Sequence, residues 1–422
     1  MPTDHIELVE QSAPCPDEDV SVWSVMNLSL VTFLVLLGLS MVAPILPDYA
    51  ASFQVNYTLV GVVISSFAIA RMLLDMPAGL LSKRFDKRII MTFGLILLST
   101  SSVLAGVAPD YVTLILARMI EGAGSAMYVT SATVFLAQIC GEEKRGQWMS
   151  MYMGMLLLGS IFGPTFGGFL ADMYDIRAPF LAYAVITGLA IIPTAVLPRS
   201  VHAEPSSPDF SPRETLTDIR AVLSSPSFLP VTFAVLIMFL LRTGVRSTLV
   251  PLFASNNLGL DSGTIGLILT IAGITTAITI TPIGHVSDRI GRKIPLAVCL
   301  LLTAVIILFI PSVTDFVSLA AVLAVYGLIV GLSGPSAAFV TDVSPQDKLE
   351  VSMGLYRTIS DFGFVLGPVL LGFVADLTAT PVPGESHSGL IGIVPFAVTS
   401  VLLLVGFIVL MTVNDPKRAS SG

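Results

Sequence analysis

The sequence predicts an all-α membrane protein with twelve transmembrane helices, arranged as two pseudo-symmetric six-helix bundles. First, the 422-residue chain is 54% apolar and only 12% charged, about half the charged share of an average soluble domain. Second, many of its apolar runs exceed the roughly 20 residues that a helix needs to cross the hydrocarbon core. Third, residues of the two halves match at a constant offset of 205 positions. These observations exclude a soluble fold and indicate a duplicated helical bundle.

Twelve spans result when apolar runs interrupted by one or two charges are counted with the uncharged ones. Their expected starts are, in order, Trp23, Tyr57, Ile89, Val112, Gln147, Ala178, Phe228, Gly263, Ile294, Phe316, Val351 and Gly389. The acidic segment before the first span contains no Lys or Arg, and the apolar run after it is too long for the core of a signal peptide. We therefore expect the first span to remain in the mature protein.

The order of spans and polar segments predicts the domain organisation. It consists of an acidic N-terminal tail (1–22), an N-terminal six-helix bundle (23–198), a linker (199–227), a C-terminal six-helix bundle (228–413) and a C-terminal tail (414–422). The linker is rich in Ser and Pro and mixes both charge signs, which is typical of a surface connection. We expect it to be partly helical, around Glu214–Leu223.

The distribution of positive charge predicts the orientation in the membrane. With both termini in the cytoplasm, the inner segments hold fifteen Lys and Arg and the outer loops hold one, Arg177. Because positive residues resist translocation, this asymmetry favours cytoplasmic termini and a multi-pass protein of the cell membrane. The formal charge of −8 comes mostly from the acidic tail, so we expect the lipid bilayer as a partner and no nucleic acid. We expect a monomer.

The repeat indicates how the two bundles are related. Gly61 matches Gly266 and Pro77 matches Pro282, and after one deletion Asp172 matches Asp376. Direct repetition with an even number of spans in each half makes the halves parallel repeats, related by an axis along the membrane normal. Transporters built in this way bind cargo near the midplane, between the repeats, and rock one bundle against the other.

A polar connection with a recurring pattern lies between two spans of each half. In the second half it runs Gly-His-Val-Ser-Asp-Arg-Ile-Gly-Arg-Lys from residue 284, and its counterpart runs Gly-Leu-Leu-Ser-Lys-Arg-Phe-Asp-Lys-Arg from residue 79. We expect the glycines to allow close backbone approach, and the charged residues to pair with one another and with helix ends. The alternative is a simple positive anchor at the inner membrane surface. The hinge residues expected from this pattern are Gly79, Lys83, Arg84, Asp86, Gly284, Asp288, Arg289, Gly291 and Arg292.

This connection resembles the motif that joins helices two and three, and again helices eight and nine, in the major facilitator superfamily. The first copy departs from the family pattern, because Lys83 stands where the family has Asp and Asp86 where it has Gly. Residues 114–124 resemble the family's helix-four motif, whose arginine, here Arg118, is implicated in proton coupling. Glu121 stands there where many members have Gln.

Residues 159–168 resemble the helix-five motif of exporters that exchange drug for proton. The small residues of this motif are expected to let helices pack closely across the moving interface, and Pro164 to set a bend. They are Gly159, Gly163, Pro164, Gly167 and Gly168. The resemblance covers nearly the whole chain and implies the major facilitator fold. It also implies proton-coupled efflux of small amphipathic compounds by alternating access, with no enzyme activity.

Ionisable residues inside spans are costly to bury and mark candidate functional sites. They are Arg71, Asp75, Arg118, Glu121, Arg242, Arg246, Arg357 and Asp361. Spacings of three or four residues place Arg71 with Asp75, Arg118 with Glu121, and Arg357 with Asp361 on shared helix faces, where they can neutralise each other. Either these are static pairs, or their acids exchange protons during transport. We expect Glu121 and Asp361, with Arg118, to couple protons, and Arg71 and Asp75 to join the charge network of the hinge.

Arg242 and Arg246 have no acid four residues away on their own helix. We expect them to line the substrate cavity together with Arg357, Tyr152 and Met155. Because the arginines in the spans outnumber the acids, a facilitator or symporter of an anionic metabolite is the alternative function. An intramembrane enzyme is disfavoured, because the sequence contains no paired-His zinc motif, nucleophile elbow or ATP-binding loop. The scattered cysteines indicate neither a disulfide framework nor a metal site, and no cofactor is expected.

Overall fold

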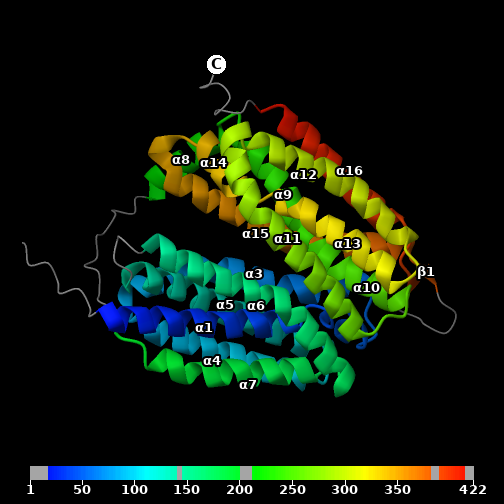
Figure 1. The fold of residues 1–422 in the computed structure, drawn as a ribbon, viewed down its shortest axis with the longest axis horizontal. Helices are drawn as coiled ribbons and strands as arrows, with labels where there is room; N and C mark the ends of the chain where they lie inside the picture. Colours follow the sequence, from blue (N-terminus) through cyan, green and yellow to red (C-terminus); the bar gives the residue numbers. More distant parts are fainter. Residues whose placement is uncertain (1–17, 140–144, 200–211, 382–388, 414–422) are drawn as a thin grey trace, which may run out of the picture.

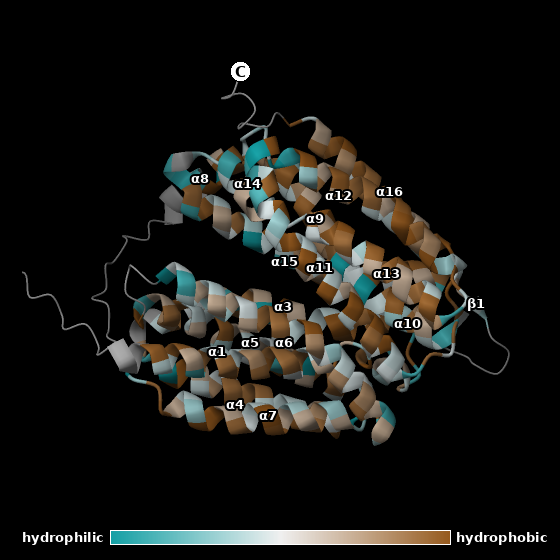
Figure 2. Ribbon diagram, viewed as in Figure 1, coloured by the Kyte–Doolittle hydropathy of each residue, from teal (hydrophilic) through white to brown (hydrophobic). Residues whose placement is uncertain are grey.

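The computed structural model describes residues 18–139, 145–199, 212–381 and 389–413. These residues contain 12 helices that are long and apolar enough to cross a membrane, which confirms the predicted all-α architecture. Hydrophobic residues run along the outward-facing helices α4, α7, α12 and α16, and hydrophilic residues gather around α8 and α14 (Figure 2). The lengths and outer surfaces of the helices therefore fit a lipid bilayer.

Two groups of helices lie side by side (Figure 1). The first, called the N bundle, comprises α1 (Glu18–Met41), α2 (Leu46–Ala51), α3 (Tyr57–Arg84), α4 (Lys87–Gly106), α5 (Tyr111–Ile139), α6 (Arg145–Met173) and α7 (Ala178–Ala195). Helix α8 (Pro212–Leu223) follows and lies in the segment predicted to be partly helical.

The second group, called the C bundle, repeats this arrangement with more interruptions. It comprises α9 (Phe228–Gly244), η1 (Val245–Leu249), α10 (Val250–Asn256), α11 (Ser262–Ile290), α12 (Lys293–Ile306), η2 (Ile307–Ser312), α13 (Phe316–Gly331), α14 (Ser336–Val343), η3 (Gln346–Lys348), α15 (Leu349–Thr378), β1 (Thr380–Pro381), β2 (Gly389–Leu390) and α16 (Val394–Met411). The prediction that the last span starts at Gly389 is wrong. Gly389 pairs with Pro381 in an antiparallel hairpin, so the helix begins only at Val394.

Local signals explain where several helices begin and end. The side chains of Asn56, Asp261 and Asp315 accept hydrogen bonds from backbone N–H groups at the starts of α3, α11 and α13, as capping residues do. Helix α11 ends at Gly291, whose φ of 92° is strained for any residue with a Cβ. Residues of the polar connections thus determine where these helices begin and end, which the lengths of the apolar runs alone do not determine.

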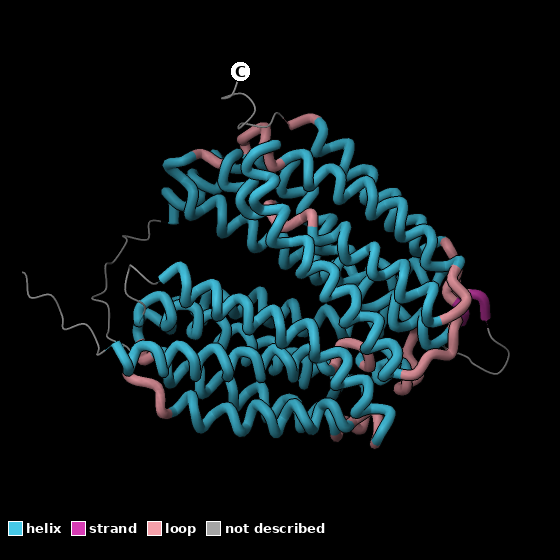
Figure 3. The backbone as a smooth tube through the Cα atoms, in the orientation of Figure 1, coloured by secondary structure: helices cyan, strands magenta, loops and turns pink. Residues whose placement is uncertain are grey.

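The two bundles touch at one end and diverge toward the other (Figures 1 and 3). We call the end with β1 and β2 the hairpin end, and the end with α8 the linker end. At the hairpin end a Cβ on Gly61 would overlap the Pro368 carbonyl, and one on Gly266 would overlap that of Pro164. Toward the linker end, a Cβ on Gly154 or Gly354 would meet nothing within 4 Å. At these glycines, the backbones of the two bundles are therefore in close contact at the hairpin end and apart toward the linker end.

Two repeat-related aspartates, here called the aspartate caps, join the bundles at the hairpin end. Asp172 of α6 accepts hydrogen bonds from the backbone N–H groups of Ser262 (3.1 Å) and Gly263 (2.7 Å), at the start of α11. Asp376 of α15 accepts bonds from the N–H groups of Tyr57 and Thr58, both at 2.8 Å, at the start of α3. Each carboxylate satisfies N–H groups that a helix start leaves free, and it faces the positive end of the helix dipole.

The helix-five glycines do not pack as predicted. A Cβ on Gly159, Gly163 or Gly167 would overlap the backbone of α1, within the same bundle, and only Gly168 meets the opposite bundle, at Ser262. Most of the motif therefore packs α6 against α1 and lies outside the interface between the bundles. The physical reason is that glycines four residues apart form one stripe, and α1 occupies that stripe.

Candidate functional site

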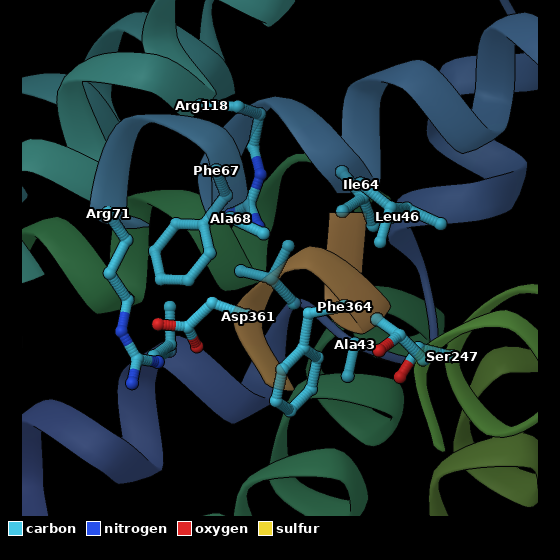
Figure 4. A pocket seen from close by; sticks show the side chains of 13 residues that line it. Ala43, Leu46, Ile64, Phe67, Ala68, Arg71, Arg118, Ser247, Asp361 and Phe364 are labelled. Carbon is cyan, nitrogen blue, oxygen red and sulfur yellow. The ribbon is translucent and has the colours of Figure 1, made fainter. Parts of the chain in front are cut away.

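A cavity of about 160 Å³ lies between the bundles, close to the roughly 150 Å³ of protein cavities that hold a benzene ring. It is lined by Leu39, Val42, Ala43, Leu46, Ile64, Phe67, Ala68, Arg71, Arg118, Thr243, Ser247, Asp361 and Phe364. Figure 4 shows these side chains, which come from helices of both bundles. We call it the central cavity. Its wall is mostly apolar, with three ionisable groups, a lining that suits a small amphipathic molecule.

Arg71 and Asp361 come from opposite bundles, and their side chains are turned toward each other in the central cavity (Figure 4). The predicted pairing of Arg357 with Asp361 is wrong. Arg357 instead binds Asp75 of α3, with 2.8 Å between Nη2 and Oδ2. This occurs because α3 packs along α15, so an acid from the neighbouring helix lies closer than the one a turn away. Within the described part of the chain, Asp361 consequently makes no ion pair.

Asp75 connects helices of both bundles. Besides Arg357, it lies 3.9 Å from Arg71 and accepts a hydrogen bond from the Thr130 hydroxyl at 3.2 Å. The predicted contact between Arg71 and Asp75 is thus present, although it is the longer of the two ion pairs. These contacts place Asp75 at the junction of α3, α5 and α15.

Arg118 and Glu121 form a buried ion pair, as their spacing predicts. The Arg118 Nη1 and Glu121 Oε2 atoms are 2.5 Å apart, and the Arg118 guanidinium lies 4.9 Å from the centroid of the Phe67 ring. Arg118 borders the central cavity, whereas Glu121 is 0% exposed and lies behind it. Glu121 Oε1 and Arg118 Nε have no hydrogen-bond partner among the described residues.

Helix α9 is interrupted at η1, a π-helical turn that carries Arg246. Arg246 is half-buried and donates from Nη2 to the Leu269 carbonyl at 3.1 Å. Arg242 is exposed and lines a second cavity of about 140 Å³ within the C bundle. We call this the C-bundle cavity. It is lined by Val235, Met238, Phe239, Leu241, Arg242, Ile280, Thr303, Tyr326, Val330, Ser333, Gly334, Ser336 and Leu403.

Four of the five residues predicted to line the substrate cavity line neither of these two cavities, namely Arg246, Arg357, Tyr152 and Met155. Tyr152 is fully buried and Met155 is half-buried, and neither lines the central cavity or the C-bundle cavity. Sequence reasoning missed Phe67 and Phe364, which do line the central cavity. A signal for both was available, because Phe67 precedes Arg71 by one helical turn and Phe364 follows Asp361 by one, on the same helix faces.

The second copy of the hinge pattern forms an ion-pair cluster at the linker end. Arg292 lies 3.6 Å from Asp288 and 3.0 Å from Asp342, and it also donates to the Ala338 carbonyl. Arg289 is exposed. The predicted pairing of charges within the pattern is therefore present in this copy, and it fixes α11 and the start of α12 against α14.

The last cation of each copy of the hinge pattern binds the end of the last helix in its own bundle. Arg88 donates to the carbonyls of Ala195 and Leu197, both at 3.2 Å, at the end of α7. Its repeat counterpart, Lys293, donates to the carbonyls of Met411 (3.0 Å) and Val413 (2.5 Å), at the end of α16. A cation at the negative end of a helix dipole is stabilising. The repeat therefore preserves a contact as well as a sequence pattern.

Two of the predicted hinge glycines, Gly79 and Gly284, make no close backbone contact, contrary to the prediction. A Cβ on Gly79 would come no closer than 3.8 Å to Thr130, and one on Gly284 would meet nothing within 4 Å. The reason is that the bundles diverge at this end. Asp86 caps α4 by accepting from the Arg88 N–H at 3.0 Å. The side chains of Lys83 and Arg84 lie outside the described part of the chain.

Comparisons with known proteins agree with this architecture. The family model of the Major Facilitator Superfamily matches residues 28–262 and 231–422. The chain is 24% identical over 348 residues to Multidrug resistance protein 1 of Bacillus subtilis strain 168, covering 82% of this chain and 88% of that protein. It is 24% identical over 353 residues to Quinolone resistance protein NorA of Staphylococcus aureus strain COL, covering 82% and 88%.

Solved structures share the fold at low sequence identity. The crystal structure of a bacterial homolog to the human lysosomal transporter Spinster, in an inward-facing and unoccupied conformation, aligns with a TM-score of 0.77 at 15% identity, covering 94% of this chain and 98% of that one. The nucleoside transporter NupG aligns with a TM-score of 0.76 at 16% identity, covering 93% and 100%. With twelve apolar helices and family matches that together extend from residue 28 to the last residue, the chain belongs to the Major Facilitator Superfamily and is a multi-pass membrane transporter.

Proposed function

We propose that this transporter is a proton-coupled exporter of small amphipathic compounds that works by alternating access. The observation that carries the proposal is Asp361, an acid inside a span that faces the central cavity and makes no ion pair with any described residue. An ionisable group at such a position is a candidate for the proton pathway. The names of the relatives, multidrug resistance and quinolone resistance, support cargo of this kind.

We propose that the linker end faces the cytoplasm. Lys87, Arg88, Arg289 and Lys293 all belong to connections at that end, whereas Arg177 is at the hairpin end. The positive-inside rule supports this orientation and cytoplasmic termini in the cell membrane. The described conformation, with the bundles apart at the linker end, is then inward-facing.

Exchange of proton and cargo follows from the charge balance of the central cavity. When Asp361 is ionised, its carboxylate and the Arg71 guanidinium from the opposite bundle attract each other. Protonation removes that attraction and lowers the charge-dependent cost of moving the bundles relative to each other. Cargo and proton would thus act on the same contact. We propose that residues 23–198 and 228–413 move as two bodies in a monomer, and that Arg118 and Glu121 hold a second exchangeable proton.

Proteoliposomes with an imposed pH gradient test this proposal. We expect the wild-type protein to move fluorescent amphipathic dyes against their concentration gradient, and Asp361→Asn to abolish the gradient-driven part while leaving downhill dye exchange intact. Asp347→Asn is the matched control, because Asp347 is exposed at the linker end and borders neither cavity. If Asp361→Asn still concentrates dye as the wild type does, Asp361 is not the coupling residue.

A further inference from the structure

We propose that Arg242 and Arg246 form an anion subsite beside the central cavity, which binds the carboxylate or sulfonate group of an amphipathic cargo. This inference rests on the proposed transport function and names the chemical class of its cargo. The planar guanidinium group binds such anions with two parallel hydrogen bonds, a geometry that also selects for them.

The two arginines lie four residues apart in the seventh span, so a regular helix would place them on one face. Their positive charges repel each other at that spacing. Arg246 lies within the π-turn η1, where the Thr248 hydroxyl donates to the Thr243 carbonyl at 3.2 Å. π-turns cost stability and occur frequently at functional sites. The irregular backbone therefore coincides with the position of the second charge.

No carboxylate among the described residues forms an ion pair with Arg242 or Arg246. The titratable groups that act electrostatically on Arg246 are Arg242 and the phenol of Tyr326, and every ion pair found in the described ranges involves other residues. A guanidinium has five N–H donors, of which Arg246 uses one on the Leu269 carbonyl. Unpaired charge inside a span is costly unless water or a ligand compensates it. A bound anion would supply the missing charge.

The surroundings of the pair select an amphipathic anion rather than an inorganic one. Arg242 lines the C-bundle cavity together with apolar side chains such as Val235, Met238 and Phe239, and with the hydroxyl groups of Tyr326 and Ser336. The hydroxyls provide further donors for an anion, and the apolar wall provides contact area for a hydrocarbon or aromatic body. A small hydrated anion would gain nothing from that wall.

The subsite also lies where the two bundles meet. A Cβ on Gly273 of α11 would lie 3.4 Å from Arg246 Nη2 and 3.3 Å from Ile161 Cγ1 of α6, in the opposite bundle. Ser247, the residue after Arg246, lines the central cavity. An anion held by Arg246 would therefore be sensitive to the relative position of the bundles, as the cargo of a rocking transporter must be.

Binding of a matched probe series tests the subsite without transport. The probes are 1-naphthoate, its neutral amide and 1-naphthylmethylamine, which share one aromatic body and differ in charge. We expect the purified full-length protein in detergent to bind naphthoate at least about tenfold more tightly than the amide, as charge-assisted hydrogen bonds do. We expect Arg242→Gln/Arg246→Gln to remove this preference while leaving amide affinity within about twofold. Isothermal titration calorimetry measures all three.

Two control variants separate loss of charge from loss of structure. Arg242→Lys/Arg246→Lys keeps the charge and should retain part of the preference for naphthoate. Arg220→Gln, at an exposed position of α8, should retain all of it. Equal affinity of the wild type for naphthoate and amide, or an unchanged preference in the Gln variant, would overturn the proposal. Displacement of naphthoate by phosphatidylglycerol in the micelles would assign the subsite to a lipid headgroup and also overturn it. Selective binding of naphthoate without gradient-driven transport would leave the subsite standing and refute the exporter function.

Discussion

Glu121 is fully buried, and its one ion pair within the described structure is with Arg118, at 2.5 Å. Removing one partner of a buried pair leaves the other as an uncompensated charge, whereas replacing both by apolar residues can be neutral. We therefore expect Arg118→Leu to destabilise the protein by about 3–5 kcal/mol, and Arg118→Leu/Glu121→Leu to regain most of that loss. Thermal unfolding in detergent measures both. A loss in the double variant equal to the sum of the losses in Arg118→Leu and Glu121→Leu would mean that the two charges act independently.

The ion pairs also show where sequence spacing stops being informative. Three-residue spacing was sufficient for Arg118 and Glu121, because no competing acid from another helix reaches Arg118 in the described structure. Four-residue spacing was not sufficient for Arg357, because α15 packs against α3 and brings Asp75 within 2.8 Å. Which helices are neighbours depends on bundle topology, and the spacing of residues along one helix does not specify that topology. The absence of an acid beside Arg242 and Arg246, by contrast, was visible in the sequence.

At the scale of the element, length and hydropathy determine the spans, and turn chemistry determines their ends. All twelve spans were predictable because membrane thickness sets a minimum number of apolar residues. The start of α16 was not predictable, because Gly389 and Leu390 belong to the same uncharged run as the helix that follows and are held by backbone pairing with β1. The sequence also did not predict which helix packs against the helix-five glycines, since a stripe of small residues does not specify its neighbour.

Helix α6 offers a matched test of close packing. A Cβ on Gly167 would overlap the backbone of Met41, which cannot move without shifting α1, whereas a Cβ on Gly154 would meet nothing within 4 Å. We expect Gly167→Ala to lower the unfolding temperature in detergent, and Gly154→Ala to leave it unchanged or to raise it, since Ala is favoured over Gly in a helix by roughly 1 kcal/mol. If both variants behave alike, helix propensity rather than contact with α1 decides the stability of this element.

For the molecule as a whole, we expect the contacts of the hairpin end to influence which conformation of the proposed alternating-access cycle is populated. The aspartate caps each tie a helix start of one bundle to a carboxylate of the other. These bonds must break when the hairpin end opens, so they stabilise the described conformation relative to the opposite one. Asp342 and Arg292, at the linker end, lie within one bundle and can persist in both conformations. Because the pair of Arg357 with Asp75, in the linker half, also joins the bundles, we expect the equilibrium between the two conformations to depend on the aspartate caps together with that pair.

We expect Asp48 of α2, at the hairpin end, to make this equilibrium depend on pH. Burial raises the pKa of Asp48 from its ordinary value of 3.8 to about 6, although a hydrogen bond with Ser255 opposes the shift. If the hairpin end opens to water, we expect the pKa of the Asp48 carboxyl to return toward its ordinary value, because the burial that raises it is lost. The closed form then binds more protons between these pH values, so its added stability is complete below the ordinary pKa and is lost as pH rises through about 6.

We therefore expect the hairpin end to be closed more often at pH 5 than at pH 7.5. Spin labels at Val112 and Val317, which are 63% and 71% exposed at the starts of α5 and α13, report the distance between the bundles by electron–electron double resonance. Asp48→Asn should keep the hairpin end closed at both pH values, because its side chain cannot ionise. Asp376→Asn should open it at both, because the cap on α3 loses its charge while Asp48 remains. A distance distribution that moves with pH equally in the wild type and in Asp48→Asn would assign the pH response to another group.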